Sequence, residues 1–408
     1  MSDLATHGGP KAKPTPYNQP NKYGDDELAQ LKEVIDSGNL MGPGGKVKEF
    51  ERAVAQAFGA RHVVMVTSGT AALHTALASL GVSEGDEVIT TPMTDIGTVS
   101  AILALHAIPV FADIDLQTRL ICPKSVRDRI TPRTKVIVSV HMAGLPCDMD
   151  SFMELSEERG VRILEDCAQA HGGKYRSRAL GTLGHAAGFS MNESKQMSTG
   201  DGGFVVTNDD ETAEIASLYR DKTYERQRPI PRGQQPIPFF ALNYRPSALQ
   251  AAVGIAQLGK LDRVVSRRDA IARRYYEALR DLPGLEMPKV CPGGEPSWWP
   301  LPARYVGEGP TRDELVVALA AEGIPIGTGM SPADNILRTE LILKKKYYPL
   351  SEAIPHFWCE TEYDPDSCPN VDELQRTVMR LPVDQRYTDQ DVGQTIAGIL
   401  KVWGHYFS

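Results

Sequence analysis

The chain has 408 residues, enough for two or three domains around a large buried core. Its 41% hydrophobic and 24% charged residues are ordinary for a globular enzyme and exclude a disordered or fibrous protein. Acidic residues outnumber basic ones by 52 to 44, so the net charge of -8 gives no overall basic footprint for nucleic acid.

The N-terminal residues 1–24 are polar and proline-rich, which indicates a loose arm. They contain no apolar stretch of signal-peptide length, and no stretch elsewhere approaches a membrane-spanning length. The six cysteines are scattered without the close pairs of a zinc site, which favours free thiols in a reducing compartment. We therefore expect a cytoplasmic protein that uses neither a metal nor a membrane.

Helices and strands alternate along the chain. Apolar periodicity predicts helices over 25–36, 46–58, 71–81, 96–106, 149–159 and 211–220. Short apolar runs predict strands over 61–66, 87–91, 109–114, 135–141, 161–165, 187–191 and 204–207. Strands separated by helices favour parallel pairing with helices on both faces of the sheet. Ligands bind beyond the carboxyl ends of such strands, where Ser68, Asp166 and Lys195 fall.

Two of these strand ends have side chains suited to a phosphorylated cofactor. Ser68, Gly69 and Thr70 join a strand to a helix, where free amides and hydroxyls can hold a phosphate, although an ordinary N-cap is the alternative. Asp166 follows an apolar strand, so its buried carboxylate needs a partner such as a pyridinium N–H, or else it caps the next helix.

A third strand end contains a lysine. Lys195 stands in GFSMNESKQMSTGDGG, before a glycine-rich turn. A lysine whose pKa is lowered can form a Schiff base with a carbonyl cofactor, and a surface lysine beside a hairpin turn is the alternative. A phosphate turn, a strand-end aspartate and a lysine together match what pyridoxal phosphate requires.

The chain resembles the DegT/StrS family of pyridoxal-phosphate aminotransferases, which act on keto sugars and related cyclic ketones. The resemblance runs from about Asn39 to the C-terminus and rests on GNLMGPGGKVKEFERAVAQAFGA, TSGTAALHTAL, IPVFADID, VHMAGLPCDMD, EDCAQAHG, GFSMNESKQMSTGDGGFVVTND, ALNYRPSALQAAVGIAQLGKLD and LPV. It implies an α/β pyridoxal-phosphate transferase type I fold, with a mostly parallel central sheet, helices on both faces and a smaller C-terminal α+β domain. Some members are dehydratases with histidine in place of the lysine, so Lys195 favours transamination.

The resemblance also implies roles for individual residues. Lys195 would bind pyridoxal 5'-phosphate covalently and then act as general base and acid, Asp166 would pair with the ring nitrogen, and Gln169 would contact the phenolic oxygen. The phosphate would be held by Ser68, Gly69, Thr70 and Ser190, with Asn243 reaching it from the neighbouring subunit of a homodimer. The alternative for Asn243 is turn chemistry before Pro246.

One position departs from the family. Relatives usually place an aromatic ring on the cofactor where this chain has Asp95, in TPMTDIGTVSAI, so no stacking residue is assigned. His171 is either a second ring contact or a structural histidine. The basic, proline-rich segment 222–240, with Arg226, Arg228 and Arg232, is either a rim that reaches an anionic or polyhydroxy substrate or a solvated loop.

We expect an N-terminal arm over 1–24, a large cofactor-binding domain over 25–265 and a small domain over 266–408, with helices at 267–281 and 312–322. Segment 330–370 resembles the family less and is expected to contain substrate-specific insertions.

The expected function is transamination of a keto sugar or cyclitol ketone, with L-glutamate or L-glutamine as amino donor, in amino-sugar or antibiotic biosynthesis. The alternative is an aromatising dehydration of an aminodehydroquinate-like substrate, as in the aminohydroxybenzoate synthases. A non-enzymatic role ranks last, because Lys195 and Asp166 are both present.

Overall fold

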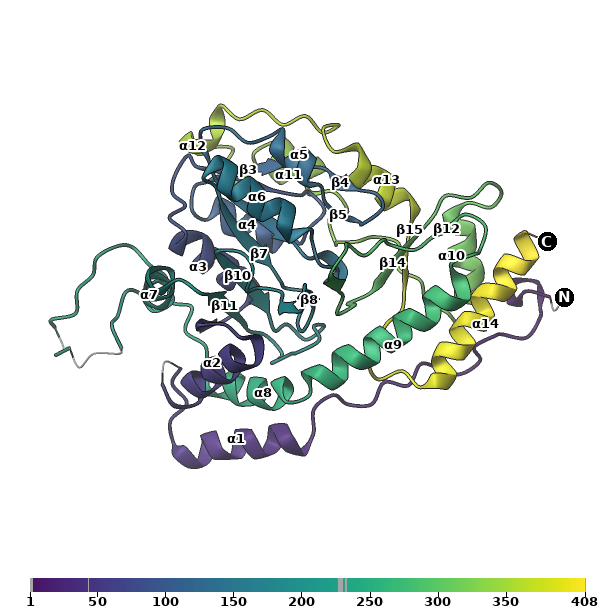
Figure 1. The fold of residues 1–408 in the computed structure, drawn as a ribbon, viewed down its shortest axis with the longest axis horizontal. Coiled ribbons are helices and arrows are strands. Elements are labelled where there is room, and N and C mark those ends of the chain that lie inside the picture. The colour runs from purple at the N-terminus through teal and green to yellow at the C-terminus, as the bar shows by residue number, and fades with distance from the viewer. Residues whose placement is uncertain (1–2, 43, 227–229, 232, 408) are drawn as a thin grey trace.

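The structure is a computed structural model that describes residues 3–42, 44–226, 230–231 and 233–407. Arg228 and Arg232 of the expected substrate rim lie outside the described residues. In Figure 1 the central sheet and its helices form one large body, and part of the C-terminal third of the chain forms a smaller one beside it.

The central sheet has seven strands in the order β1–β11–β10–β7–β6–β2–β3. The strands are β1 His62–Val66, β2 Glu87–Thr90, β3 Ile108–Phe111, β6 Thr134–Val140, β7 Arg162–Asp166, β10 Ala186–Ser190 and β11 Gly203–Thr207. Pairing is parallel from β10 through β7, β6 and β2 to β3, which confirms the mostly parallel sheet. The strand predicted over 109–114 is split, because β4, Ile114–Asp115, pairs instead with β5, Leu120–Ile121.

Strand β11 is the exception to the parallel arrangement, since it runs antiparallel to both β10 and β1. A parallel return needs a crossover of a dozen or more residues, usually a helix. The loop 191–202 between β10 and β11 contains no helix, so the chain turns straight back. This loop contains Lys195.

Helices cover both faces of the sheet (Figure 1). In the large body they are α1 Asp25–Ser37, α2 Gly45–Phe58, α3 Gly69–Ser79, α4 Ile96–Leu103, α5 Pro123–Arg127, α6 Met149–Arg159, α7 Asp210–Tyr219 and α8 Ala248–Leu258. Helix α3 packs on β10 and β11, and α6 packs on β7. The sequence analysis did not predict α8, although Ser247 and Gln250 form a capping box at its start.

The C-terminal third builds a second, three-stranded sheet in the order β12–β14–β15, which is antiparallel. Its elements are α9 Leu261–Leu279, β12 Leu285–Glu286, β14 Leu301–Tyr305, α10 Arg312–Ala321, α13 Pro369–Thr377, β15 Val378–Leu381 and α14 Asp389–Tyr406. A third small sheet joins β13 Gly294–Glu295 to β8 Lys174–Tyr175 and β9 Arg178–Ala179, so a strand from beyond 266 pairs with the large body. The boundaries 25–265 and 266–408 stay a prediction.

Segment 330–370 lies largely against the large body. It contains η3 Ile336–Arg338, α11 Glu340–Leu343 and α12 His356–Cys359. The backbone N–H of Ile336 donates to Pro92 O at 3.0 Å, and the hydroxyl of Tyr363 donates to Pro109 O at 2.9 Å. These contacts hold the segment beside β2 and β3.

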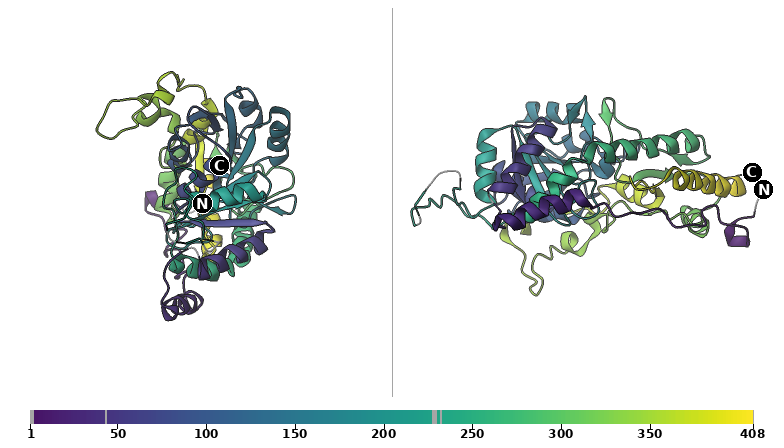
Figure 2. Two further views of the ribbon diagram at one scale, coloured as in Figure 1. Left: turned by 90° about the vertical axis from the view of Figure 1, so that its left-hand side faces the viewer. Right: turned by 90° about the horizontal axis from the view of Figure 1, so that it is seen from below.

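The N-terminal segment is tied down rather than loose, which corrects the expectation. It contains the short helix η1, Ala5–His7, and its Leu4 and Lys13 are buried. Lys13 Nζ forms an ion pair with Asp391 of α14, and the backbone N–H of Ala5 donates to Glu322 at 2.8 Å. The two chain ends therefore lie together (Figures 1 and 2). These two contacts join residues more than 300 positions apart, so local periodicity could not reveal them.

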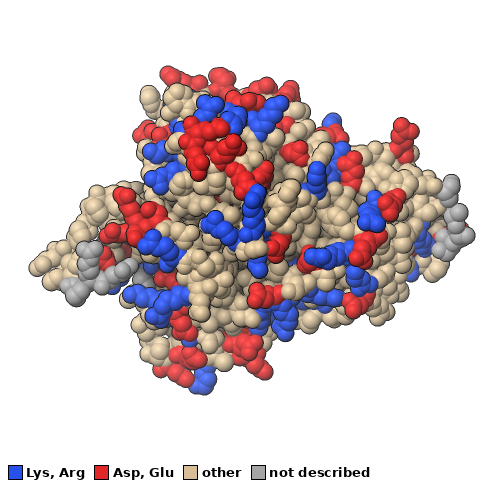
Figure 3. Space-filling view, viewed as in Figure 1, with Lys and Arg blue, Asp and Glu red and all other residues tan. Residues whose placement is uncertain are grey.

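Surface charge and helix composition are the features relevant to nucleic acid and membrane binding. On the face shown in Figure 3, acidic and basic side chains are intermixed, without a broad basic patch. No helix in the part of the chain that the structure describes combines the length and the apolar character needed to cross a bilayer.

Candidate active site

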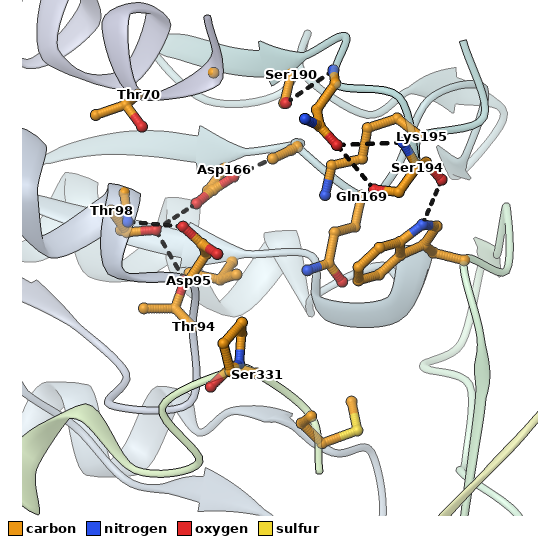
Figure 4. A pocket seen from close by; sticks show the side chains of 18 of the residues that line it. Thr70, Thr94, Asp95, Thr98, Asp166, Gln169, Ser190, Ser194, Lys195 and Ser331 are labelled. Atoms are coloured by element: carbon orange, nitrogen blue, oxygen red, sulfur yellow. Dashed lines mark hydrogen bonds between the residues drawn. The ribbon is translucent and has the colours of Figure 1, made fainter. Parts of the chain in front are cut away.

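A cavity of about 710 Å³ lies at the carboxyl ends of β1, β7 and β10. It is bordered by the N-terminal ends of α3 and α4 and by the C-terminal third of the chain. Figure 4 shows side chains from these separate elements pointing into one space. Of the residues that the resemblance implies for the cofactor, those that line the cavity are Ser68, Gly69, Thr70, Asp166, Gln169, Ser190 and Lys195.

The first turn of α3 forms one corner of the cavity. Ser68 caps the helix, with its Oγ accepting from the backbone N–H of Ala71 at 3.1 Å. The next amides, of Gly69 and Thr70, belong to the first helical turn, where the helix itself offers no acceptor. A Cβ on Gly69 would lie 2.6 Å from Ser190 Cβ, so glycine is needed for this close approach. The corner thus combines free amides, hydroxyls and a positive helix end, which is the donor set of a phosphate site.

Asp166 ends β7 and is buried, with 4% of its surface exposed. Its Oδ2 accepts from Thr98 Oγ1 at 2.8 Å and its Oδ1 accepts from the backbone N–H of Ala168 at 3.1 Å (Figure 4). Burial raises the pKa of Asp166, and these two hydrogen bonds act against that rise. A cationic N–H within hydrogen-bonding distance of the Asp166 carboxylate would stabilise the charged form of Asp166.

Lys195 is half-buried in the loop between β10 and β11. Burial lowers the pKa of Lys195, and the negative charges of Asp166 and Asp95 oppose this effect. Its Nζ lies 4.1 Å from the ring centroid of Trp299, whose Nε1 donates to Ser194 O at 2.8 Å. A lysine with a lowered pKa is more often neutral near pH 7, and only the neutral amine can act as nucleophile or proton acceptor.

Gln169 has a defined amide orientation. Its Oε1 accepts from the backbone N–H of Ala143 at 2.8 Å, so the amide group Nε2 remains as a donor. In Figure 4 the side chain reaches toward the cavity between Asp166 and the Lys195 loop. A phenolic oxygen of a cofactor ring would be a suitable acceptor for this amide.

Two residues in doubt after the sequence analysis lie away from the cavity. His171 does not line it but is fully buried, with its ring 5.3 Å from that of Phe189, and burial lowers its pKa to about 3. His171 is therefore a structural histidine. Asn243 also does not line the cavity of its own chain, and its Oδ1 accepts from the backbone N–H of Arg245 at 3.3 Å. Its contribution to a partner subunit stays a prediction.

Asp95, which stands where relatives usually have an aromatic ring, caps a helix in the structure. Asp95 is exposed at the cavity edge and caps α4, since its Oδ1 accepts from the backbone N–H of Gly97 at 2.8 Å. Trp299, from the C-terminal third, supplies an aromatic ring to the same cavity.

Sequence analysis missed several lining residues: Thr98, Trp299, Ser331 and Arg380. Thr98 stands one helical turn after Asp95, a spacing that places both on one face of α4. Trp299 stands in the aromatic run SWWP, but no spacing rule connects it to a lysine 104 positions earlier.

Comparison with known proteins identifies the family. The model of the DegT/DnrJ/EryC1/StrS aminotransferase family matches residues 21–400. The chain belongs to this family. It is 34% identical over 391 residues to the spore coat polysaccharide biosynthesis protein SpsC of Bacillus subtilis (strain 168), covering 94% of this chain and 96% of that protein.

Solved structures agree with the family. An aminotransferase from Psychrobacter cryohalolentis superposes with a TM-score of 0.85 and 26% identity, over 96% of this chain and 100% of that chain. A 3-amino-5-hydroxybenzoic acid synthase superposes with a TM-score of 0.82 and 29% identity, over 97% of this chain and 100% of that chain. The protein is thus a pyridoxal-phosphate-dependent aminotransferase with the type I fold, as the resemblance implied.

The cavity of this family member fits pyridoxal 5'-phosphate. The amide-rich corner at α3 suits the phosphate, and the buried carboxylate of Asp166 suits a protonated ring nitrogen. The amine of Lys195 lies in the same cavity and suits an aldehyde.

Proposed function

We propose that this enzyme transfers an amino group from L-glutamate or L-glutamine to a keto sugar or a cyclitol ketone. The observation that supports this most directly is the half-buried amine of Lys195 in one cavity with the buried carboxylate of Asp166. A sugar substrate is supported by the similarity to a spore coat polysaccharide biosynthesis protein.

In this proposal each group of side chains binds a different part of the cofactor. The corner formed by Ser68, Gly69, Thr70 and Ser190 binds the cofactor phosphate. Asp166 would keep the ring nitrogen protonated, and Gln169 Nε2 would donate to the phenolic oxygen. Pyridoxal phosphate, when bound, supplies an aldehyde that condenses with amines and a protonated ring that accepts electrons from the adjacent carbon.

Lys195 has two tasks in turn. Its Nζ would hold the cofactor covalently until an amino donor displaces it. The freed amine would then accept the proton from the donor's α carbon, as a general base. With the ketone the same amine would act as general acid and give a proton to the carbon that receives the amino group.

An absorbance experiment tests the proposal. The purified enzyme with cofactor should be yellow, lose its visible absorbance with L-glutamate or L-glutamine, and regain it with one keto sugar or cyclitol ketone. Screening both donors against a panel of ketones would identify the pair. If neither amino acid changes the spectrum, the proposed donors are wrong.

A second candidate is supported by the likeness to 3-amino-5-hydroxybenzoic acid synthase. An aromatising dehydration would convert a cyclic precursor to an ultraviolet-absorbing arene without any amino donor. The two candidates therefore differ in whether product formation requires the donor.

We further propose a cytoplasmic homodimer that serves amino-sugar or antibiotic biosynthesis. The described part of segment 222–240 projects from the body beside α7 (Figure 1), and its Ile237 and Phe240 are 72% and 80% exposed. Leu40 and Met41 are also exposed. A second copy that covers such side chains would remove apolar surface from water. Analytical ultracentrifugation would give the oligomeric state.

A further inference from the structure

Lys195 lies between two residues that are each tied to another part of the molecule. On one side, Ser194 O accepts from Trp299 Nε1 at 2.8 Å (Figure 4). On the other side, Gln196 is buried, with 3% of its surface exposed, and its Nε2 donates to Gln169 O at 2.6 Å. Lys195 is therefore held through both of its neighbours in the chain.

The hydrogen bond from Gln196 belongs to a closed ring. Gln169 Oε1 accepts from the backbone N–H of Ala143, and Ala143 O accepts from the backbone N–H of Trp299, both at 2.8 Å. The indole N–H of Trp299 then returns to the lysine loop at Ser194. The ring joins the lysine loop, the turns after β6 and β7, and the C-terminal third of the chain.

The amide of Gln196 makes a second contact in a closely packed space. Its Nε2 also donates to the buried hydroxyl of Ser297 at 3.2 Å. A Cβ on Gly144 would lie 2.8 Å from Ser297 Oγ and 3.0 Å from Gln169 O, and its φ of +78° also favours glycine. Because a carbonyl oxygen can only accept, the nitrogen of the Gln196 amide must face Gln169 O. The amide therefore has one defined orientation.

The lysine loop depends on such side-chain contacts for its shape. Residues 191–202 form neither a helix nor a strand, so no ladder of backbone hydrogen bonds fixes them. The Nζ of Lys195 lies 4.1 Å from the ring centroid of Trp299, a member of the same ring of hydrogen bonds. The position of this amine in the cavity is thus set by the bonds at Ser194 and Gln196.

We propose that Gln196 is a positioning residue for Lys195. Its amide fixes the lysine loop to Gln169 and Ser297, so that the amine keeps one place in the cavity. The inference deepens the proposed function, in which this amine is displaced and must then accept a proton from the donor. A displacement of about 1 Å at a reacting group can cost about 100-fold in rate. The other possibility is that Gln196 only stabilises the fold.

The first experiment uses the enzyme without cofactor and needs no turnover. Acetic anhydride labels neutral amines, and mass spectrometry of the peptide with Lys195 gives its labelling at a series of pH values. Burial is the larger effect on Lys195 and lowers its pKa. Gln196→Met keeps the length of the side chain but removes the donors, so the loosened lysine gains water. The midpoint of labelling should move to higher pH, toward that of an ordinary lysine.

The control loses a buried hydrogen bond elsewhere. Ser156→Ala, on α6, removes a bond of 2.6 Å to Val161 O and does not touch the cavity. It should lower the melting temperature and leave the Lys195 midpoint as in wild type. A folded Gln196→Met with the wild-type midpoint would overturn the inference and leave Gln196 a role in stability alone.

The second experiment follows the enzyme with cofactor by absorbance. At saturating donor, Gln196→Met should lose its visible absorbance about 10- to 100-fold more slowly than wild type, and the donor concentration that gives half the maximal rate should be unchanged. An unchanged rate with a higher donor requirement would assign Gln196 to donor binding and refute the positioning role. If no donor changes the wild-type spectrum, the proposed function is wrong, while the labelling result still decides the role of Gln196.

A milder variant covers the case in which Gln196→Met does not fold, which melting temperatures would show. Gln196→Asn keeps the amide but is one methylene shorter, so it cannot reach both Gln169 O and Ser297 Oγ. Its labelling midpoint should lie between those of wild type and an ordinary exposed lysine such as Lys174. A folded Gln196→Asn whose Lys195 labels as in wild type would contradict the proposal.

Discussion

Burial acts in opposite directions on the two central residues of the site. It lowers the pKa of Lys195 and raises the pKa of Asp166, so each side chain is shifted toward its neutral form. A neutral amine is what a nucleophile and proton acceptor needs. A buried carboxylate is stabilised by a nearby positive charge. In the proposal this charge is that of the protonated cofactor ring.

Replacing Lys195 tests its role as nucleophile and proton acceptor. Lys195→Ala should reduce turnover by more than the roughly 100- to 10,000-fold typical of a proton-transfer residue, because the covalent link is lost as well. Cofactor should still bind through the phosphate corner. Borohydride reduction followed by mass spectrometry should label wild type at Lys195 and leave the variant unlabelled. Lys174→Ala, at an exposed lysine of β8, is the control. Full turnover in Lys195→Ala would refute the role.

Asp166→Asn tests the carboxylate through stability. Because burial raises its pKa, the folded protein without cofactor loses stability as pH rises through that pKa. Near pH 7 the asparagine variant without cofactor should therefore melt at a higher temperature than wild type, and this advantage should shrink at a pH below the usual aspartate pKa, about 3.9. Added cofactor should stabilise wild type more than the variant. Scanning calorimetry at several pH values measures both effects, and a wild type that is the more stable protein at pH 7 without cofactor would contradict the account.

At the scale of elements, the residues of the site stand at the ends of strands, at the starts of helices and in the loop between β10 and β11. Asp166 is the last residue of β7 and Ser190 the last of β10, while Ser68 and Asp95 cap α3 and α4. The direct return from β10 to β11 places the Lys195 loop at the same edge of the sheet. Each of these positions follows from where an element stops, so small errors in a predicted boundary do not move the site.

The contact between α3 and β10 gives a prediction at this scale. Gly69→Ala would place a Cβ 2.6 Å from Ser190 Cβ, and overpacking of this kind costs about 1–3 kcal/mol. If the helix start moves away from Ser190 to relieve it, cofactor affinity should fall by about 5- to 150-fold. Equilibrium dialysis of the cofactor measures this. Gly24→Ala, at the N-cap of α1 where a Cβ meets nothing within 4 Å, should leave the affinity unchanged. Wild-type affinity in Gly69→Ala would show that the corner is not the phosphate site.

At the scale of the whole molecule, two distant parts of the chain meet at the cavity. The large body supplies the cofactor residues, and the C-terminal third supplies Trp299 and Arg380. Segment 330–370, held against β2 and β3, brings Ser331 to the cavity. The N-terminal arm joins α10 and α14 and also reaches the Lys195 loop, where the Tyr23 hydroxyl donates to Glu193 at 2.5 Å.

The proposed homodimer predicts sharing of sites between subunits. Lys195→Ala and Asn243→Ala are each expected to impair the enzyme. If Asn243 serves the partner, a mixed dimer of the two variants contains one intact site, and a statistical mixture should recover about a quarter of wild-type activity. Co-expression with two affinity tags isolates the mixed dimer for assay. Recovery no greater than that of the separate variants would place Asn243 in its own chain's site or outside any site.

The sequence by itself determined the alternation of strands and helices, the type of cofactor site and the residues next to strand ends, because these depend on local periodicity and short motifs. Helix α6 has its predicted bounds of 149–159, and Ser68, Asp166 and Lys195 meet at one cavity as their positions after strands indicate.

Only the tertiary structure decided the rest. The direction of β11, the anchoring of the N-terminal arm and the meeting of Trp299, Ser331 and Arg380 with Lys195 depend on contacts between residues far apart in the chain. Such contacts leave no periodic or spacing signal in a single sequence, because each is made once, by packing between distant elements.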